Sequence, residues 1–64
     1  MKRADLLKHL RTHDCKLLRE GARHSVYINP TSGQMSTVPR HTDIISFLAR
    51  KICKDLGIPV VTGK

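Results

Sequence analysis

The hydrophobic and polar residues of this chain alternate with two different periods, which predict two helices and three short strands. In residues 4–13, Leu6, Leu7 and Leu10 fall on one face of a helix, and charged or polar residues fall on the other. Residues 45–56 show the same spacing more strongly. The apolar residues of this second predicted helix are Ile45, Leu48, Ala49, Ile52, Cys53 and Leu56. We expect both apolar faces to pack on one face of a sheet.

The two predicted helices have recognisable ends. We expect the first to end beside Asp14, because aspartate can adopt the left-handed conformation that glycine takes more easily. We expect the second to begin at His41 or Thr42, with Asp43 in its first turn. The second helix should then stop at Gly57, in a Schellman-type cap.

Three strand-like segments lie between the helices, at residues 15–20, 25–29 and 35–38. The middle segment alternates most clearly, because Val26 and Ile28 share one face, which we expect the helices to cover. By the same parity His24 lies on that covered side, at the end of the strand. In the first segment, the adjacent Leu17 and Leu18 leave the register open.

Turn-forming residues join these segments into an antiparallel sheet. Gly21 and Ala22 form the first turn, residues 29–34 form a hairpin loop, and Pro39 ends the third strand. The predicted fold class is therefore α+β. Its order is helix, three antiparallel strands, helix, with both helices packed on one face of the sheet.

One small domain fits a chain of 64 residues. We assign residues 1–59 to this domain and residues 60–64 to a short C-terminal tail. Twelve Lys and Arg residues against five Asp and Glu residues give a formal charge of +7. Such an excess points to a polyanionic partner, either nucleic acid or an acidic protein, with a solvated surface as the alternative.

The basic residues are scattered along the chain, and no apolar run is long enough to cross a bilayer. We therefore expect no membrane partner and a cytoplasmic location. Cys15 and Cys53 should then be reduced core residues. His9, His13 and Cys15 lie close in sequence, but their spacing fits no standard zinc site. We predict no metal, no other cofactor and no small-molecule ligand.

His24 follows a glycine turn and has Lys16, Arg19 and Arg23 nearby in the sequence. An imidazole can take the proton of an RNA 2′-hydroxyl, which is already positioned to attack the adjacent phosphate. Neighbouring cations can stabilise the charge that develops there. The Gly-x-x-His pattern is weak by itself, and on chemistry alone an exposed histidine at a strand end is the more frequent explanation.

Two further groups of residues carry weaker signals. His41 follows Arg40 before a helix N-terminus, where backbone N–H groups attract phosphate, but a capping role explains it better. Arg50, Lys51 and Lys54 lie on the exposed side of the second predicted helix. Positive charge suits the last turns of a helix, so a solvated face explains them as well as a phosphate-binding one.

Three features taken together resemble the HicA (YcfA-like) toxin family. They are the Gly-x-x-His element within residues 17–27, a Val-Pro-x-His step at residues 38–41, and a terminal helix ending in Leu-Gly-Ile at residues 56–58. The resemblance covers residues 1–59 and implies a fold like that of double-stranded-RNA-binding domains. It also implies an mRNA interferase, the toxin of a type II toxin–antitoxin pair, which cleaves mRNA without a metal and is neutralised by a HicB-type antitoxin.

The resemblance also gives roles to individual residues. The family's catalytic histidine corresponds to His24, acting as general base or acid, and its turn glycine corresponds to Gly21. The residues that we expect to hold the RNA are Lys16, Arg19, Gly21, Arg23 and Arg40.

This chain departs from the family pattern at three positions. Ala22 replaces the serine common after the glycine, and Arg23 replaces the polar residue or histidine that precedes the catalytic histidine. If that serine assists substrate placement, cleavage by this chain should be slower or should use Arg23 instead. Asp14 replaces the usual glycine at the end of the first helix, which affects local geometry alone.

Two alternatives to an RNA-cleaving toxin stay open on the sequence. The first is a non-catalytic RNA-binding module of the same fold, which would have no need of His24. The second is a protein-interaction subunit whose basic surface is shaped for an acidic antitoxin. This second alternative is compatible with cleavage, since an inhibitor that covers His24 would neutralise charge and block the site together.

Overall fold

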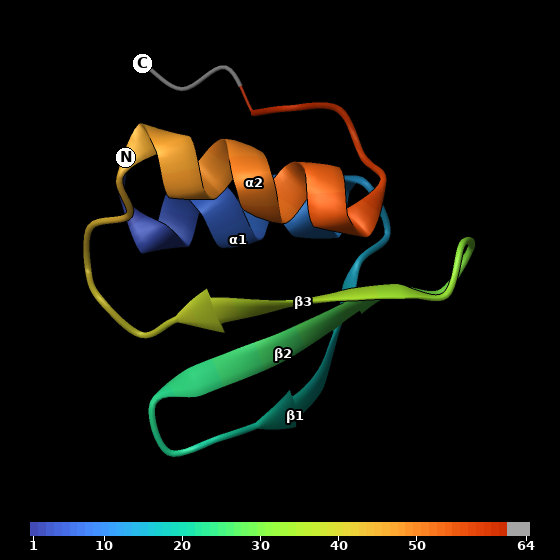
Figure 1. Ribbon diagram of the computed structural model, residues 1–64, viewed down its shortest axis with the longest axis horizontal. Helices are drawn as coiled ribbons and strands as arrows, with labels where there is room; N and C mark the ends of the chain where they lie inside the picture. Colours follow the sequence, from blue (N-terminus) through green and yellow to red (C-terminus); the bar gives the residue numbers. More distant parts are fainter. Residues whose placement is uncertain (62–64) are drawn as a thin grey trace.

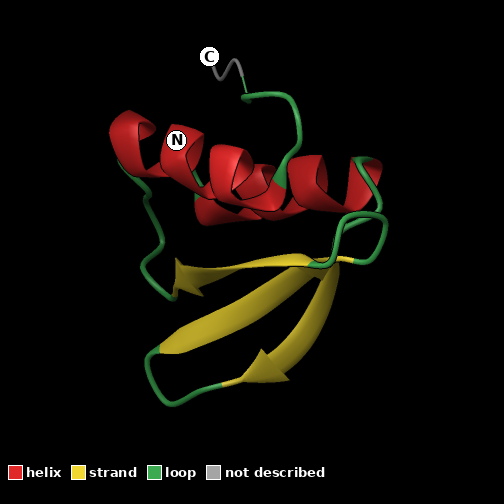
Figure 2. Cartoon of the chain, turned by 45° about the vertical axis from the view of Figure 1, so that its right-hand side comes forward, coloured by secondary structure: helices red, strands yellow, loops and turns green. Residues whose placement is uncertain are grey.

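A computed structural model describes residues 1–61 of the chain. Its elements are α1 (Arg3–Thr12), β1 (Lys16–Glu20), β2 (His24–Asn29), β3 (Gln34–Pro39) and α2 (Ser46–Leu56). The predicted order and the α+β class are confirmed. Both helices lie on one face of the sheet, and the other face of the sheet is left open (Figures 1 and 2).

The sheet has the strand order β1-β2-β3, and both strand pairs are antiparallel. A bulge interrupts β1 at Leu18, because Leu17 pairs with Tyr27 while Arg19 pairs with Val26. This bulge settles the register that the two adjacent leucines left open.

The face of β2 that the helices cover carries Ser25, Tyr27 and Asn29, which are 0%, 8% and 6% exposed. Val26 and Ile28 lie on the opposite, open face and are half-buried. The prediction that the helices cover these two β-branched residues was therefore wrong. Polar side chains can occupy a covered face at little cost when they find hydrogen-bond partners, and both Ser25 and Asn29 do so.

Asn29 shows how that covered face is satisfied. Its side-chain amide donates to the carbonyl oxygen of Leu56 at 2.8 Å, and its side-chain oxygen accepts from the N–H of Thr31 at 3.1 Å. The first bond occupies a carbonyl at the end of α2, which has no partner within the helix.

His24 belongs by parity to the open face with Val26, so its predicted place on the helix-covered side was also wrong.

The hydrophobic core lies between the helices and the sheet, and α2 contributes more to it than any other element. The largest fully buried apolar residues of the core are Leu6, Leu10, Val38, Ile44, Ile52, Cys53 and Leu56. From β2 and β3, only Tyr27 and Val38 join this apolar cluster. The sheet therefore contributes a thin apolar layer, and side-chain hydrogen bonds of Ser25 and Asn29 also hold β2.

The ends of both helices agree with their predicted caps. Asp14 has φ 67°, in the left-handed region, just after α1. Gly57 has φ 69° and donates its N–H to the carbonyl oxygen of Lys54 at 3.1 Å. The N–H of Ile58 donates to Cys53 O at 3.0 Å, which completes a Schellman cap.

The start of α2 differs from the prediction. The helix begins at Ser46, later than the His41 or Thr42 start expected from capping residues. The preceding residues stay outside the helix because Ile44 pairs with the chain's N-terminus: the Met1 ammonium donates to Ile44 O at 2.8 Å, and Ile44 N–H donates to Met1 O at 2.7 Å. Ile45, expected on the packing face, is 69% exposed.

The segment after α2 returns over the helices. His9 Nε2 lies 2.8 Å from the carbonyl oxygen of Pro59, and Val60 and Val61 are half-buried against the core. The remainder of the predicted tail, residues 62–64, lies outside the described residues. Within the part of the chain that is described, no helix combines the length and hydrophobicity needed to cross a membrane.

Candidate active site

The turn between β1 and β2 sets the backbone position of His24. The N–H of Gly21 donates to the carbonyl oxygen of His24 at 2.7 Å. A Cβ atom at position 21 would lie 2.9 Å from that oxygen, closer than such contacts normally come. A glycine is therefore needed for this close approach, and the predicted turn glycine holds the strand end that carries His24.

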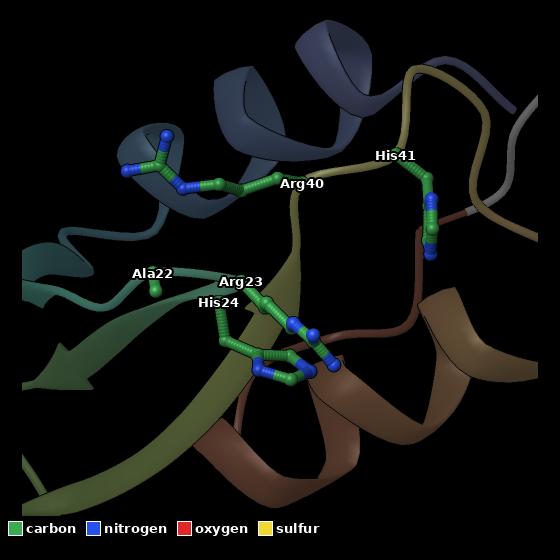
Figure 3. A pocket seen from close by; sticks show the side chains of 5 residues that line it. All are labelled: Ala22, Arg23, His24, Arg40 and His41. Atoms are coloured by element: carbon green, nitrogen blue, oxygen red, sulfur yellow. The ribbon is translucent and has the colours of Figure 1, made fainter.

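An open depression of about 530 Å³ lies beside this turn. It is lined by Ala22, Arg23, His24, Arg40 and His41, and every one of these residues is exposed. The structure thus brings the β1–β2 turn together with the segment that follows β3. In Figure 3 the side chains of Arg23 and His24 extend in the same direction, whereas His41 stands apart on the other side of the hollow.

Not all of the cations predicted to hold RNA reach this depression. Lys16 pairs with Ile28, four residues along β2 from His24, which is roughly 13 Å at the usual rise per residue. Arg19 pairs with Val26, so its side chain lies on the open face of the sheet, as that of His24 does. It does not line the depression. Arg23 is the cation that the structure places beside His24.

Arg40 lines the depression but directs its charge elsewhere. Its Nη2 atom forms an ion pair with Glu20 Oε1, and both side chains are about half exposed. Figure 3 shows the Arg40 side chain extending away from Arg23 and His24. The charge of Arg40 is therefore partly compensated within the chain, which the sequence did not indicate.

Glu20 belongs to a hydrogen-bond network on the helix-covered face of the sheet, at the end of the sheet where His24 lies. Sequence reasoning missed this network. The hydroxyl of Ser25, which is 0% exposed, donates to Glu20 Oε1 at 2.8 Å. The same hydroxyl accepts from Arg3 Nη2 at 3.0 Å, and Arg3 Nε donates to the carbonyl oxygen of Pro39 at 2.8 Å. The network thus connects α1 with all three strands at the end of the sheet where His24 lies.

The electrostatics of the network favour an ionised Glu20. The hydrogen bond from Ser25 lowers the pKa of this carboxyl most, and Arg40 and Arg3 lower it further, against a partial opposing effect of desolvation. Glu20 is therefore a carboxylate at neutral pH, and it can hold Arg40 and Ser25 at the same time.

Part of this network could have been found in the sequence. Glu20 and Ser25 flank the turn and are paired across it, so a tight hairpin there predicts that their side chains share a face. Arg3 offers no such signal, because it lies 22 residues from Ser25 and reaches it through the packing of α1 on the sheet.

The remaining histidine and cysteine residues form no second centre. Across residues 1–61, no three His, Cys, Asp or Glu side chains are close enough together to hold a metal ion. The ring centroids of His9 and His13 lie 4.6 Å apart, and the rings pack edge to face. Cys15 and Cys53 are free and buried, and burial raises the pKa of both thiols.

Comparison with known proteins places this architecture. A family model described as the HicA toxin of bacterial toxin–antitoxin systems matches residues 3–58. The chain belongs to the HicA toxin family. The match includes both helices, all three strands and every residue that lines the depression around His24. No curated protein and no solved structure gives a match.

Membership of the HicA family gives the chain its general role. It is a toxin of a toxin–antitoxin system, and such a toxin is paired with an antitoxin partner.

Proposed function

We propose that this HicA-family chain is an endoribonuclease that cleaves mRNA without a metal, with His24 as general base or acid. The observation that carries the proposal is the placement of His24. Its imidazole is exposed in an open depression beside Arg23, on a strand end that Gly21 holds in place. An exposed imidazole beside a cation is the combination that cleavage of an RNA phosphodiester needs.

The cleavage needs few protein groups, because RNA carries its own nucleophile. An imidazole accepts the proton of the 2′-hydroxyl, the 2′-oxygen attacks the adjacent phosphorus, and the bond to the 5′-oxygen of the next nucleotide breaks. The leaving 5′-oxygen receives a proton from the imidazolium or from water. In this scheme His24 moves the proton, and the guanidinium of Arg23 stabilises the charge that develops on the phosphate oxygens.

The shape of the site favours a polymer over a small molecule. Small-molecule sites are concave and bury most of their ligand, whereas all five residues that line this depression are exposed. An extended strand can cross such a site with one phosphate beside His24 and the rest of the chain outside it. An mRNA substrate also agrees with the expected cytoplasmic location.

Incubation of the purified protein with single-stranded RNA in the presence of a chelator tests this proposal. We expect fragments with the unmodified chain and none with His24→Ala, while the thermal melting curve stays nearly unchanged because an exposed side chain supports little packing. His13→Ala, outside the depression, is the matched control and should cleave normally. RNA binding without fragments from the unmodified chain would instead support the non-catalytic RNA-binding module.

We further propose that the partner is a HicB-type antitoxin that covers the His24 depression. The net charge of +7 favours an acidic surface on this partner, so the affinity of the complex should fall as salt concentration rises. Affinity that is indifferent to salt would contradict this electrostatic account.

A further inference from the structure

The depression around His24 has little positive charge of its own for a site that binds a polyanion. Arg40 is paired with Glu20, and Lys16 lies at the far end of the sheet from His24. Arg23 is left as the cation beside the imidazole. If the chain binds RNA as proposed above, much of the affinity has to come from another surface.

The outer face of α2 is such a surface. Phe47, Arg50, Lys51 and Lys54 follow one another at i, i+3, i+4 and i+7, so they lie on one side of the helix. They line a hollow of about 410 Å³. The residues that α2 buries lie on its opposite side and are Ala49, Ile52, Cys53 and Leu56. We call the four outward residues the α2 basic face.

The charge of the α2 basic face is mostly uncompensated. Lys51 Nζ donates to Asp55 Oδ2 at 3.0 Å, an i,i+4 pair on the exposed side of the helix. Neither Arg50 nor Lys54 makes an ion pair with any residue in the described part of the chain. Two cations are thus available there, compared with one beside His24.

Phe47 separates this surface from an ordinary solvated helix face. Its side chain is 68% exposed, although it lies in the same hollow as three cations. Single-stranded nucleic acid offers both kinds of group that such a surface binds: bases that stack on aromatic rings and phosphates that pair with lysine and arginine. An acidic protein segment would satisfy the cations but would leave the aromatic ring without a defined partner.

We propose that the α2 basic face is a second docking surface for the RNA substrate. A single-stranded segment places a base on Phe47 and adjacent phosphates on Arg50 and Lys54. This inference rests on the proposed function. Figure 1 shows that α2 begins at the end of the sheet where β3 stops, and the depression around His24 includes residues that directly follow β3. An RNA strand that leaves that depression past the end of β3 can therefore reach the start of α2, where Phe47 lies.

Binding of a short fluorescently labelled single-stranded RNA, measured by anisotropy in chelator, tests this surface. All variants are made in the His24→Ala background so that no cleavage occurs. Arg50→Gln with Lys54→Gln should reduce the slope of log affinity against log salt by about 1.4, the value for two lost phosphate contacts on a single strand. The matched control is Lys8→Gln with Arg11→Gln, which removes the same charge from exposed positions on α1 and should change affinity less.

The aromatic contact has its own comparison. Phe47→Ala should weaken RNA binding about tenfold, whereas Ile45→Ala, at a neighbouring apolar position that is 69% exposed, should leave it unchanged. Equal losses from the α1 and α2 charge pairs, or wild-type affinity in Phe47→Ala, would overturn the inference. Normal RNA binding with loss of antitoxin binding would show that the surface belongs to the protein partner.

A failure of the docking surface can be distinguished from a failure of the proposed cleavage. In the background that retains His24, the α2 variants should raise the RNA concentration needed for half-maximal cleavage and leave the rate at saturation unchanged. If the unmodified chain does not cleave RNA at all, the proposed function fails. If it cleaves and the α2 variants behave like wild type, the docking surface alone fails.

Discussion

Replacement of Ser25 by alanine isolates the network that supports the candidate site. The side chain is fully buried, and its hydroxyl donates to Glu20 at 2.8 Å and accepts from Arg3 at 3.0 Å. Ser25→Ala removes both hydrogen bonds and leaves a methyl group, so the packing changes little. The substitution therefore reports on hydrogen bonding rather than on a cavity.

The expected loss follows from the partners of Ser25. Hydrogen bonds to charged groups contribute about 1.5–3 kcal/mol each to stability. The loss here should be smaller than the sum of two, because the Glu20 side chain is 50% exposed and can bind water, and Arg3 keeps its bond to the carbonyl of Pro39. We expect a decrease of about 1–2 kcal/mol in the free energy of unfolding, which lowers Tm by roughly 4–16 °C in a domain of this size.

Urea unfolding and thermal melts followed by circular dichroism at neutral pH measure this loss. Ser36→Ala is the matched control, because Ser36 also lies in the sheet but makes a single long contact of 3.5 Å to the carbonyl of Thr37. This control should change stability by less than about 0.5 kcal/mol. A Ser25→Ala variant as stable as the control would show that the network does not hold this end of the sheet.

Three further predictions concern the turn, the carboxylate and the thiols. Gly21→Ala should cost about 1–3 kcal/mol of stability and slow cleavage, since its Cβ would press on the carbonyl of His24; unchanged unfolding and cleavage would contradict this. The folded state lowers the pKa of Glu20, so its contribution to stability is complete above the pKa of the unfolded chain and is lost as pH falls through the lower folded value. The urea midpoint should therefore drop in acid, and less so in Glu20→Gln; identical pH profiles would refute the assignment. Cys15 and Cys53, which are buried with raised pKa values, should react with a thiol reagent slowly when folded and rapidly in denaturant; fast reaction of the folded chain would contradict their burial.

Local patterns predicted the parts of this fold that local interactions determine. Asp14 and Gly57 end their helices as expected, because the left-handed conformation and the Schellman bonds involve neighbouring residues alone. The predicted start of α2 was wrong, because Ile44 pairs with Met1, which is far from it in the sequence. Capping rules consider residues that are close in sequence to the end of a helix, so they do not predict that contact.

The face of β2 shows a different limit of sequence reasoning. Hydrophobicity favoured Val26 and Ile28 for the covered side, yet Ser25 and Asn29 are buried there because each finds hydrogen-bond partners from other elements. Strand periodicity predicts that alternate residues share a face, but it does not say which face is covered when a polar set can be satisfied.

The candidate site follows the same division. His24 and Gly21 were found through a short motif and a family resemblance, and the structure adds the close approach that couples them. The ion pair that draws Arg40 to Glu20 was not predicted. It matters for function, because it removes one cation from the set expected to bind RNA beside the imidazole.

The most direct test of the central claim compares RNA cleavage by the unmodified chain and by His24→Ala in the presence of a chelator, together with their thermal melts. The account predicts RNA fragments from the unmodified chain, none from the variant, and nearly equal melting temperatures. Cleavage by a folded His24→Ala variant would contradict the assignment of His24 as the catalytic residue.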